Sequence, residues 1–276
     1  MNALMYHDVV APDAEDASGF PGRDAALYKV TPDVFEAHLD AIERLLPASP
    51  RPAHPAPPAY PAHPAPPAYP APMITFDDGG SSAVMAADLL ERRGWIGYFF
   101  VTTNYIGTRG FLTESDIQDL ARRGHVVGSH SCSHPLRMGH CSWPQLVDEW
   151  TRSLSVLSEI VGDDVRDASV PGGDFAPQVA EAAARAGITR LFTSEPTSEV
   201  RHAFGLKLVG RFAVQRWTTA DTAAALAAGD WLACARQAVT WNAKKMTKRI
   251  GGERYLQIRK ALLRHGDEVR WGDTKT

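Results

Sequence analysis

Two sets of residues suited to metal and acid–base chemistry stand directly after two strand-like runs. Asp77-Asp78 ends a short apolar run and is followed by two glycines, and His130 and His134 come after a β-branched run about fifty residues later. Imidazole and carboxylate groups are typical ligands of catalytic divalent metals, which keep a coordination position open for water. One carboxylate and two imidazoles therefore predict an open metal site rather than a closed structural one.

The two adjacent carboxylates are expected to have different roles. Side chains alternate along a strand, so Asp77 and Asp78 should point in different directions, one as a metal ligand and the other acting on a proton. Taken alone, Asp-Asp-Gly after a strand also describes a solvated turn, and His-x-x-x-His also describes an incidental surface pair. Their order, each after a strand, favours a shared site.

These stretches resemble two motifs of a known family. Thr75-Phe76-Asp77-Asp78-Gly79 and His130-Ser131-Cys132-Ser133-His134-Pro135 are similar to the first two motifs of the polysaccharide deacetylases, carbohydrate esterase family 4, which share the NodB homology domain. In layout the resemblance extends over residues 2–215. It implies that Asp77 is the catalytic base and that Asp78, His130 and His134 hold a divalent metal, with zinc expected first and a metal-bound water as nucleophile.

The third motif of the family is only partly present. Pro171-Gly172-Gly173 is similar to its proline-centred turn and is expected to shape the sugar groove, although it also reads as an ordinary strand-to-helix turn. The resemblance places at position 169 an arginine that orients the base, but this chain has Ser169. Arg166 is then the candidate to compensate, because a nearby cation lowers the pKa of a carboxylate.

The proton donor has no clear match either. The last motif of the family, Leu-x-His, is absent, which leaves His202 as the candidate general acid and His140 as a weaker one. His7, in Tyr-His-Asp-Val after the first predicted strand, resembles a histidine near the active site of family members that act on poly-N-acetylglucosamine. It is expected to bind substrate or tune Asp77, or else to cap the strand. Cys132 is a further ligand candidate.

Strand-like and helix-like runs alternate through most of the chain, which indicates a parallel sheet or barrel. With the resemblance, the expected fold is α/β, a distorted (β/α) barrel of the NodB homology type with a C-terminal helical extension. Residues 11–31 are expected to form a loop over the mouth of the site. Arg211 lies in a predicted last strand, 206–212, and Trp217 follows this strand. Both are considered as sugar contacts.

Composition limits the remaining possibilities. The chain has 276 residues, 44% of them apolar, a net charge of -3 and three cysteines without paired spacing. This suits one α/β domain in a reducing compartment, and gives no indication of a nucleic-acid partner. The start of the chain lacks the features of a signal peptide and no long apolar run is present, so a cytoplasmic localisation is expected.

Two segments depart from the barrel pattern. Within a predicted insertion at 47–72, residues 52–60 and 61–69 repeat one proline-rich nonapeptide, which favours extended polyproline II or a loop. The predicted domains are therefore 1–217, including this insertion, and a basic helical extension at 218–276 packed on the barrel. Residues 234–265 carry nine Lys or Arg and one acid. They are interpreted as a helical cap or as a dock for a membrane surface or a glycosyltransferase.

The function predicted from these observations is the metal-dependent hydrolysis of an N-acetyl group on an N-acetylated sugar or polysaccharide precursor. One alternative keeps the fold and changes the bond to another C–N amide, such as a formamide or cyclic amide. The other is a degenerate member of the family that binds glycan or serves as a scaffold without catalysis, since the orienting arginine and the acid histidine are both missing from their expected places.

Overall fold

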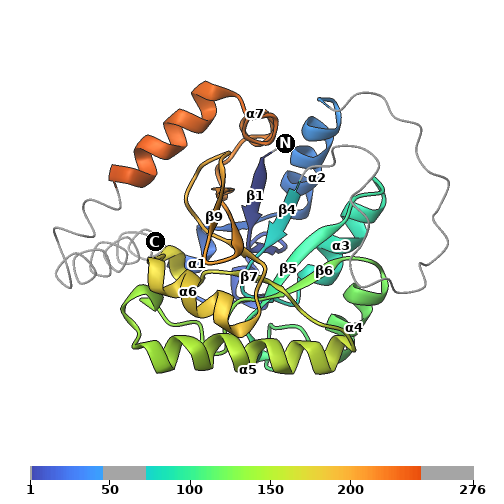
Figure 1. The fold of residues 1–276 in the computed structure, drawn as a ribbon. Coiled ribbons are helices and arrows are strands. Elements are labelled where there is room, and N and C mark those ends of the chain that lie inside the picture. Colours follow the sequence, from blue (N-terminus) through green and yellow to red (C-terminus); the bar gives the residue numbers. More distant parts are fainter. Residues whose placement is uncertain (1, 46–72, 244–276) are drawn as a thin grey trace, which may run out of the picture. The chain divides into compact units, whose positions relative to one another are not determined.

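A computed structural model describes residues 2–45 and 73–243, in which nine strands form one sheet with helices around it (Figure 1). The sheet order is β11-β1-β4-β5-β6-β7-β8-β10-β9, and every neighbouring pair is parallel except β10 and β9. The strands are β1 (Ala3–Tyr6), β4 (Met73–Phe76), β5 (Gly97–Val101), β6 (Val126–Ser129), β7 (Asp167–Ser169), β8 (Arg190–Phe192), β9 (Val200–Ala203), β10 (Leu206–Val209) and β11 (Arg211–Ala213). The α/β fold and the mostly parallel sheet of a distorted barrel are thus confirmed.

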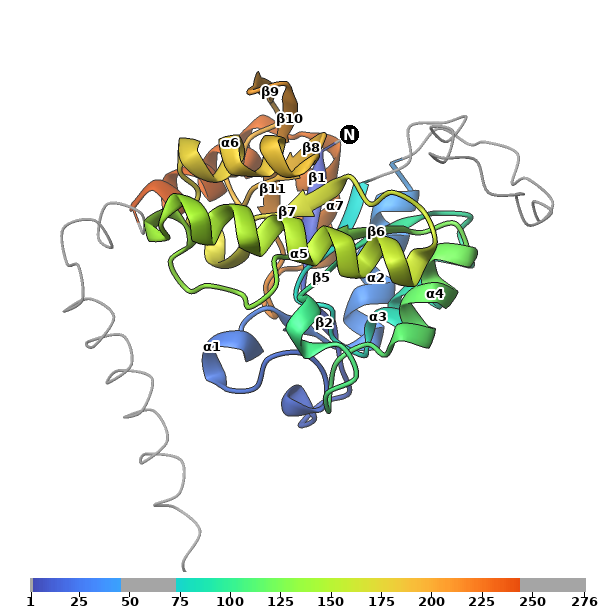
Figure 2. The same ribbon diagram turned by 60° about the horizontal axis from the view of Figure 1, so that its bottom comes forward.

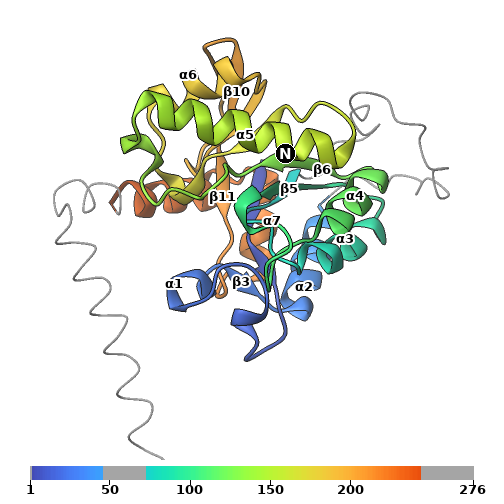
Figure 3. The same ribbon diagram turned by 90° about the horizontal axis from the view of Figure 1, so that it is seen from below.

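Helices follow most strands, as expected for parallel connections. They are α1 (Arg23–Ala26), α2 (Pro32–Glu43), α3 (Ala83–Glu91), α4 (Glu114–Arg122), α5 (Trp143–Val161), α6 (Pro177–Ala186) and α7 (Ala220–Ala228). Local signals set two of the helix ends: Thr113 and Asp116 form a capping box at the start of α4, and α6 is followed by Gly187, whose φ of 101° favours glycine. Figure 2 shows α5 and α6 side by side, and Figure 3 shows the segment of α1 on the other side of the strands from α5.

Side chains alternate between the two faces of the sheet, and each face carries its own apolar cluster. Phe76 and Phe99 belong to the large core that the helices cover, and their rings stack at 5.0 Å. Phe100 and Phe192 belong to a smaller cluster on the opposite, inner face of the sheet. Residues two apart on a strand share a face, so the inner face of β4 continues from Met73 through position 75 to position 77. Asp77 therefore leaves the sheet on its inner side.

Gly210 divides the predicted last strand in two. The run expected as one strand, 206–212, forms β10 and β11, which pair with β8 and β1 at the two sides of the sheet. A Cβ at Gly210 would lie 2.4 Å from the Thr197 side chain and 2.6 Å from the Glu195 carbonyl oxygen, so only glycine fits. The chain thus crosses from β10 to β11 through one residue, and this places Arg211 at the start of β11.

The first compact unit extends beyond the predicted boundary at residue 217. It comprises Met1–Cys234 and includes α7, which packs on α2 and β1. The second unit, Ala235–Thr276, is described only as far as residue 243. The insertion at 47–72 and most of the basic tail lie outside the described residues, so their predicted conformations stay predictions. Within the described ranges, no helix combines the length and apolar character needed to cross a bilayer.

A short buried chain of hydrogen bonds joins β1, α2 and the segment before α7. The Nε2 atom of His38 lies 2.9 Å from the Thr218 carbonyl oxygen, and its Nδ1 atom lies 3.2 Å from the Tyr6 hydroxyl. A carbonyl only accepts, so Nε2 carries the proton and Nδ1 accepts from Tyr6. Burial lowers the pKa of His38, although the bond to Thr218 acts in the opposite direction. His38 is therefore neutral in the folded protein.

We expect this histidine to make the folded state sensitive to acid. Because its pKa is lower when folded than when unfolded, the unfolded state takes up a proton first as the pH falls below about 6.5, and the unfolding free energy decreases. His38→Gln should therefore be more destabilising at pH 7.5 than at pH 5.5. Urea denaturation of both proteins at the two pH values measures this, and an equal loss at both would contradict it.

Candidate active site

Asp77 stands directly after β4 and is buried in a network of charged and polar groups. Its two carboxylate oxygens accept from the Arg211 guanidinium at 2.7 and 2.8 Å, and the Ser169 hydroxyl lies 3.1 and 3.2 Å from them. Asp77 is 3% exposed and Arg211 is fully buried. The parallel two-bond pairing holds the plane of the carboxylate as well as its position.

The sequence did not predict Arg211 as the partner of Asp77. From sequence, Arg211 was considered only as a sugar contact. Its five N–H groups are all used: besides two bonds to Asp77, it donates to the hydroxyls of Thr75 and Ser169 and to the Thr193 carbonyl. The guanidinium also lies over the rings of Phe100 and Phe192, at 5.6 and 5.8 Å. An arginine within an apolar strand-like run was the only sequence signal for this role.

Arg211 also explains Ser169, which occupies the position where the resemblance predicted an arginine. The Ser169 hydroxyl receives a hydrogen bond from Arg211 at 2.7 Å and contacts Asp77, so the cation reaches Asp77 from β11 rather than from β7. The suggestion that Arg166 compensates is wrong. Arg166 is 46% exposed at the side chain and pairs with Asp164 at 2.7 Å.

Asp78 turns away from Asp77 and faces the two histidines. Its Oδ1 atom lies 3.4 Å from Nε2 of both His130 and His134, and the potential ligand atoms of the three residues are all within 4.8 Å of one another. The Asp78 backbone has a φ of 75°, an uncommon value outside glycine and typical of constrained functional positions. The structure thus brings together the three residues predicted as ligands.

Two features of this cluster fit a divalent cation. Nδ1 of His130 lies 3.0 Å from the Ser169 carbonyl oxygen, which fixes the proton on Nδ1 and leaves the Nε2 lone pair facing Asp78. Oδ1 of Asp78 is buried and accepts no hydrogen bond from any described residue. An unpaired buried carboxylate oxygen is costly unless a cation binds it. A carboxylate and two imidazoles are a donor set of catalytic zinc.

Electrostatics keeps both acids ionised. Burial alone would raise the pKa of Asp77, but the charge and the hydrogen bonds of Arg211 outweigh it and hold the pKa of Asp77 below its usual value. For Asp78, burial is likewise outweighed by the close approach of the His130 and His134 imidazoles, and the pKa lies well below the usual range. Burial would lower the pKa of His134, and Asp78 raises it overall.

His7 follows β1, the strand beside β4. Its Nδ1 atom is buried and has no hydrogen-bond partner among the described residues, and its ring packs against Tyr28 at 4.8 Å. His7 directly follows Tyr6, which is the register partner of Phe76, so it leaves β1 beside the point where Asp77 leaves β4. His7 therefore presents a free imidazole nitrogen at the strand ends that carry the acids.

The segment predicted as a loop over the site does reach one of its histidines. Phe20 packs against the His134 ring at 4.8 Å and against Tyr105 and Phe111 at 4.8 and 5.2 Å. Buried Lys29, in the short strand β3 (Lys29–Val30), donates to the carbonyls of Glu15, Ser18 and Phe20 and so holds this segment in place. β3 pairs with β2 (Asp8–Val9), directly after His7.

The turn Pro171–Gly173 follows Ser169 and has left-handed glycines, with φ of 63° at Gly172 and 66° at Gly173. A Cβ on Gly172 would lie 3.3 Å from the Leu136 carbonyl oxygen, so the turn borders the segment after His134. This location is compatible with the predicted role in the groove, which stays a prediction.

The other residues considered from sequence lie apart from the acids. His202 is exposed on β9 and pairs in register with Lys207 near the N-terminal end of β10, whereas Asp77 follows the C-terminal end of its strand. His140 is exposed and bonds to Arg137. Cys132 is buried between the ligands but outside their cluster, and Trp217 is 59% exposed.

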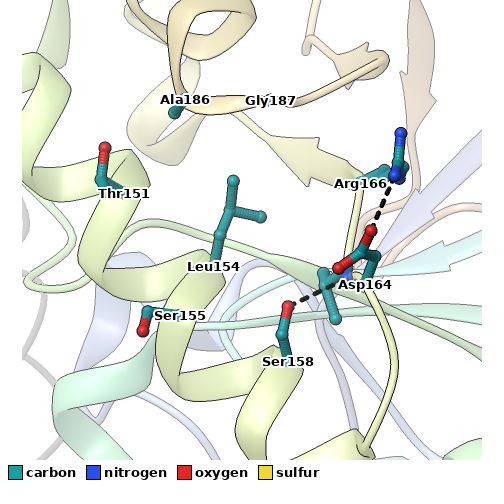
Figure 4. A pocket seen from close by; sticks show the side chains of 9 residues that line it. Thr151, Leu154, Ser155, Ser158, Asp164, Arg166, Ala186 and Gly187 are labelled. Carbon is teal, nitrogen blue, oxygen red and sulfur yellow. Dashed lines mark hydrogen bonds and ion pairs between the residues drawn. The ribbon is translucent and has the colours of Figure 1, made fainter.

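A separate cavity of about 310 Å³ lies between α5, α6 and residues 164–166 (Figure 4). Its lining residues are Thr151, Leu154, Ser155, Ser158, Asp164, Val165, Arg166, Ala186 and Gly187. Asp164 and Arg166 form an ion pair there, and the lining includes neither Asp77, Asp78 nor any histidine. We assign no role in the chemistry to this cavity.

Binding of zinc to the cluster should stabilise the folded protein. At a free concentration one hundred times the Kd, a ligand specific for the folded state adds about 2.7 kcal/mol to the unfolding free energy. For a protein of this size we expect the Tm to rise by about 5–10 °C. Thermal unfolding with zinc and with a chelator measures the difference. The shift should vanish in Asp78→Asn, and a shift of equal size in that variant would contradict the assignment.

Comparisons with known proteins agree with this geometry. A family model described as polysaccharide deacetylase matches residues 66–191. YxkH of Bacillus subtilis (strain 168), whose name assigns it provisionally to the polysaccharide deacetylases, is 26% identical over 130 residues, 47% of this chain and 46% of that protein. The chain therefore matches about half the length of this curated relative.

Similar folds occur in several solved structures. The Streptococcus pyogenes deacetylase PplD, in complex with acetate, has a TM-score of 0.59 at 20% identity, over 80% of this chain and 95% of that one. IcaB from Ammonifex degensii has a TM-score of 0.60 at 21% identity, over 82% and 96% of the two chains. A de-N-acetylase from Aggregatibacter actinomycetemcomitans has a TM-score of 0.57 at 16% identity, over 77% and 94%. At these identities the likeness shows the fold, and the polysaccharide deacetylase family model matches the part of the chain that carries Asp77, Asp78, His130 and His134.

Proposed function

We propose that this protein is a metal-dependent hydrolase that removes an N-acetyl group from an N-acetylated sugar or polysaccharide precursor. The observation that carries the proposal is the adjacency of two differently held acids: Asp78 faces His130 and His134, while Asp77 is paired with Arg211. The match of residues 66–191 to the polysaccharide deacetylase family model supports the reaction class. Two of the similar structures are a deacetylase with acetate and a de-N-acetylase, which supports an amide of acetic acid as the bond broken.

Asp78, His130 and His134 would hold the metal, which we expect to be zinc. When bound, zinc supplies two effects: it lowers the pKa of a water molecule and it polarises the amide carbonyl. The chain contributes the orientation of the ligands. The bond of His130 to the Ser169 carbonyl keeps its Nε2 atom available, and the burial of Asp78 keeps the carboxylate from being solvated.

Asp77 is the general base in this proposal. It would accept the proton of the attacking water as the new C–O bond forms. Arg211 and Ser169 hold its carboxylate in one orientation, and the charge of Arg211 keeps it ionised in a buried environment. A base that is already deprotonated and oriented does not have to reorganise during the reaction.

His7 is the proposed proton donor to the departing amine, in place of His202. Its buried Nδ1 atom is unpaired among the described residues, and His7 follows β1 at the same level as Asp77 follows β4. Protonated, this imidazole can pass a proton to the nitrogen as the C–N bond breaks, so that acetate and a free amino sugar are formed. Tyr28, against the His7 ring, would orient it.

The proposal is tested by acetate release from N-acetylglucosamine oligomers, measured with and without a chelator. We expect release that stops when metal is removed and returns when zinc is added. Release of formate from a formamide substrate, with none of acetate, would instead support hydrolysis of another amide. Binding of the oligomer without release of either acid would contradict a catalytic role.

The substrate class and the other contact partners are proposed separately from the reaction. An N-acetylated carbohydrate is the substrate that the family implies. Contact of the basic tail with a membrane or a glycosyltransferase stays a prediction, because residues 244–276 lie outside the described part of the chain.

A further inference from the structure

The turn that joins His130 to His134 is held by a carboxylate from a different element. Glu149, in the second turn of α5, accepts hydrogen bonds from the backbone N–H groups of Cys132 and Ser133 at 2.8 and 2.9 Å, both on Oε2. Its Oε1 accepts from the Ser133 hydroxyl. Both carboxylate oxygens are thus occupied by the turn, so Glu149 is not a metal ligand here.

Each of the four backbone N–H groups of residues 131–134 donates to an identified acceptor. Ser131 donates to the Ser129 hydroxyl and His134 donates to the Ser131 hydroxyl, so these two bonds are local. The remaining two, of Cys132 and Ser133, both go to Glu149. Glu149 is therefore the single long-range partner of the amides in this turn.

The turn has a backbone conformation that needs such support. Ser131 has a φ of 65° and His134 a φ of 56°, both in the left-handed region. For residues with a Cβ this region costs about 1–2 kcal/mol each. Such conformations persist only where surrounding contacts hold them. Without Glu149, two amides would lose their partner and the strained residues could relax.

Relaxation of this turn would change the distance between the two histidines. Both Nε2 atoms now lie 3.4 Å from the same Asp78 oxygen, and His134 reaches this point only through the left-handed turn. The side of the turn that faces η2 (Thr103–Tyr105) is fixed separately, since Thr103 and Asn104 donate to the carbonyls of Ser131 and Cys132. Glu149 acts on the opposite, amide side.

We propose that Glu149 is a positioning residue that sets the convergence of His130 and His134 and thereby the affinity for the metal. The inference rests on the proposed metal site. Residues that orient metal ligands through hydrogen bonds commonly change metal affinity by about 10–100-fold when they are removed. We expect an effect of this size even though Glu149 does not touch the ion.

The test uses the full chain and compares Glu149→Ala, Glu149→Gln and a control variant. Asp148→Asn is the control, because Asp148 is the adjacent acid on α5 and pairs with exposed Arg152 one turn on. The Kd for zinc is measured by competition with a chromophoric chelator, well below the Tm of each metal-free variant. That Tm is measured separately in the presence of a chelator, so that stability and affinity are distinguished.

Glu149→Ala should raise the Kd for zinc by about 10–100-fold. Glu149→Gln should raise the Kd by a smaller factor, because its amide oxygen can still accept from the two N–H groups while its NH2 group cannot accept from the Ser133 hydroxyl. Asp148→Asn should match the wild type. A lower metal-free Tm with an unchanged Kd in Glu149→Ala would overturn the inference. If Glu149→Ala does not fold, an unchanged Kd in Glu149→Gln would overturn it. A wild type that does not bind zinc would overturn the proposed function itself.

Discussion

Arg211→Met is expected to lower the unfolding free energy by about 3–5 kcal/mol, because it leaves the buried carboxylate of Asp77 without its cation. For a protein of this size the Tm should fall by about 10 °C. Misorientation of the base should also reduce acetate release per folded molecule by at least about 100-fold. Urea denaturation and a turnover assay below the lowered Tm measure the two effects.

Two further variants show whether the loss comes from the ion pair. In Arg211→Met with Asp77→Asn no buried charge is left unpaired, so the double variant should be more stable than Arg211→Met alone. Arg190→Met is a matched control, since Arg190 forms a two-bond pair with Asp167 at 2.7 Å on neighbouring strands. It should lose stability and keep its turnover. A double variant less stable than Arg211→Met would contradict the account.

Asp77→Asn should reduce acetate release by about 10²–10⁴-fold, the usual contribution of a general base. An amide cannot accept the proton of water, yet it has nearly the same shape and can still accept from Arg211. Zinc binding should therefore be unchanged, because Asp78 and the two histidines are intact. Steady-state turnover and zinc titration of the same preparation separate these outcomes.

Asp78→Asn provides the reciprocal control. It should lose zinc affinity together with turnover, since the carboxylate oxygen that both histidines face would be altered. Full turnover in Asp77→Asn would show that another group is the base. Loss of zinc in Asp77→Asn would show that the two acids do not have separate roles.

The acids and histidines could be predicted from sequence because each follows its own strand. A strand-like run and the residues just after it are local features, and the ends of parallel strands meet at one edge of a sheet. Alternation along β4 was then enough to separate the directions of Asp77 and Asp78. The structure brings Asp78, His130 and His134 within 4.8 Å of one another.

Arg211 could not be predicted as the partner of Asp77 in the same way. Residues 206–212 have the pattern of one strand, and the break at Gly210 depends on a close approach to Glu195 and Thr197 that only the folded chain shows. The neighbours of β11 depend on pairing with β1 over a separation of about two hundred residues. Arg166 is closer in sequence to Ser169, but it is exposed and paired with Asp164.

The central claim is that one divalent cation binds where Asp78, His130 and His134 converge. Crystals grown with zinc, with data collected on both sides of the zinc absorption edge, test it directly. We predict one anomalous peak per chain, about 2.0–2.2 Å from a carboxylate oxygen of Asp78 and from the Nε2 atoms of both histidines. A peak elsewhere, or none at this cluster in crystals that contain zinc, would contradict the claim.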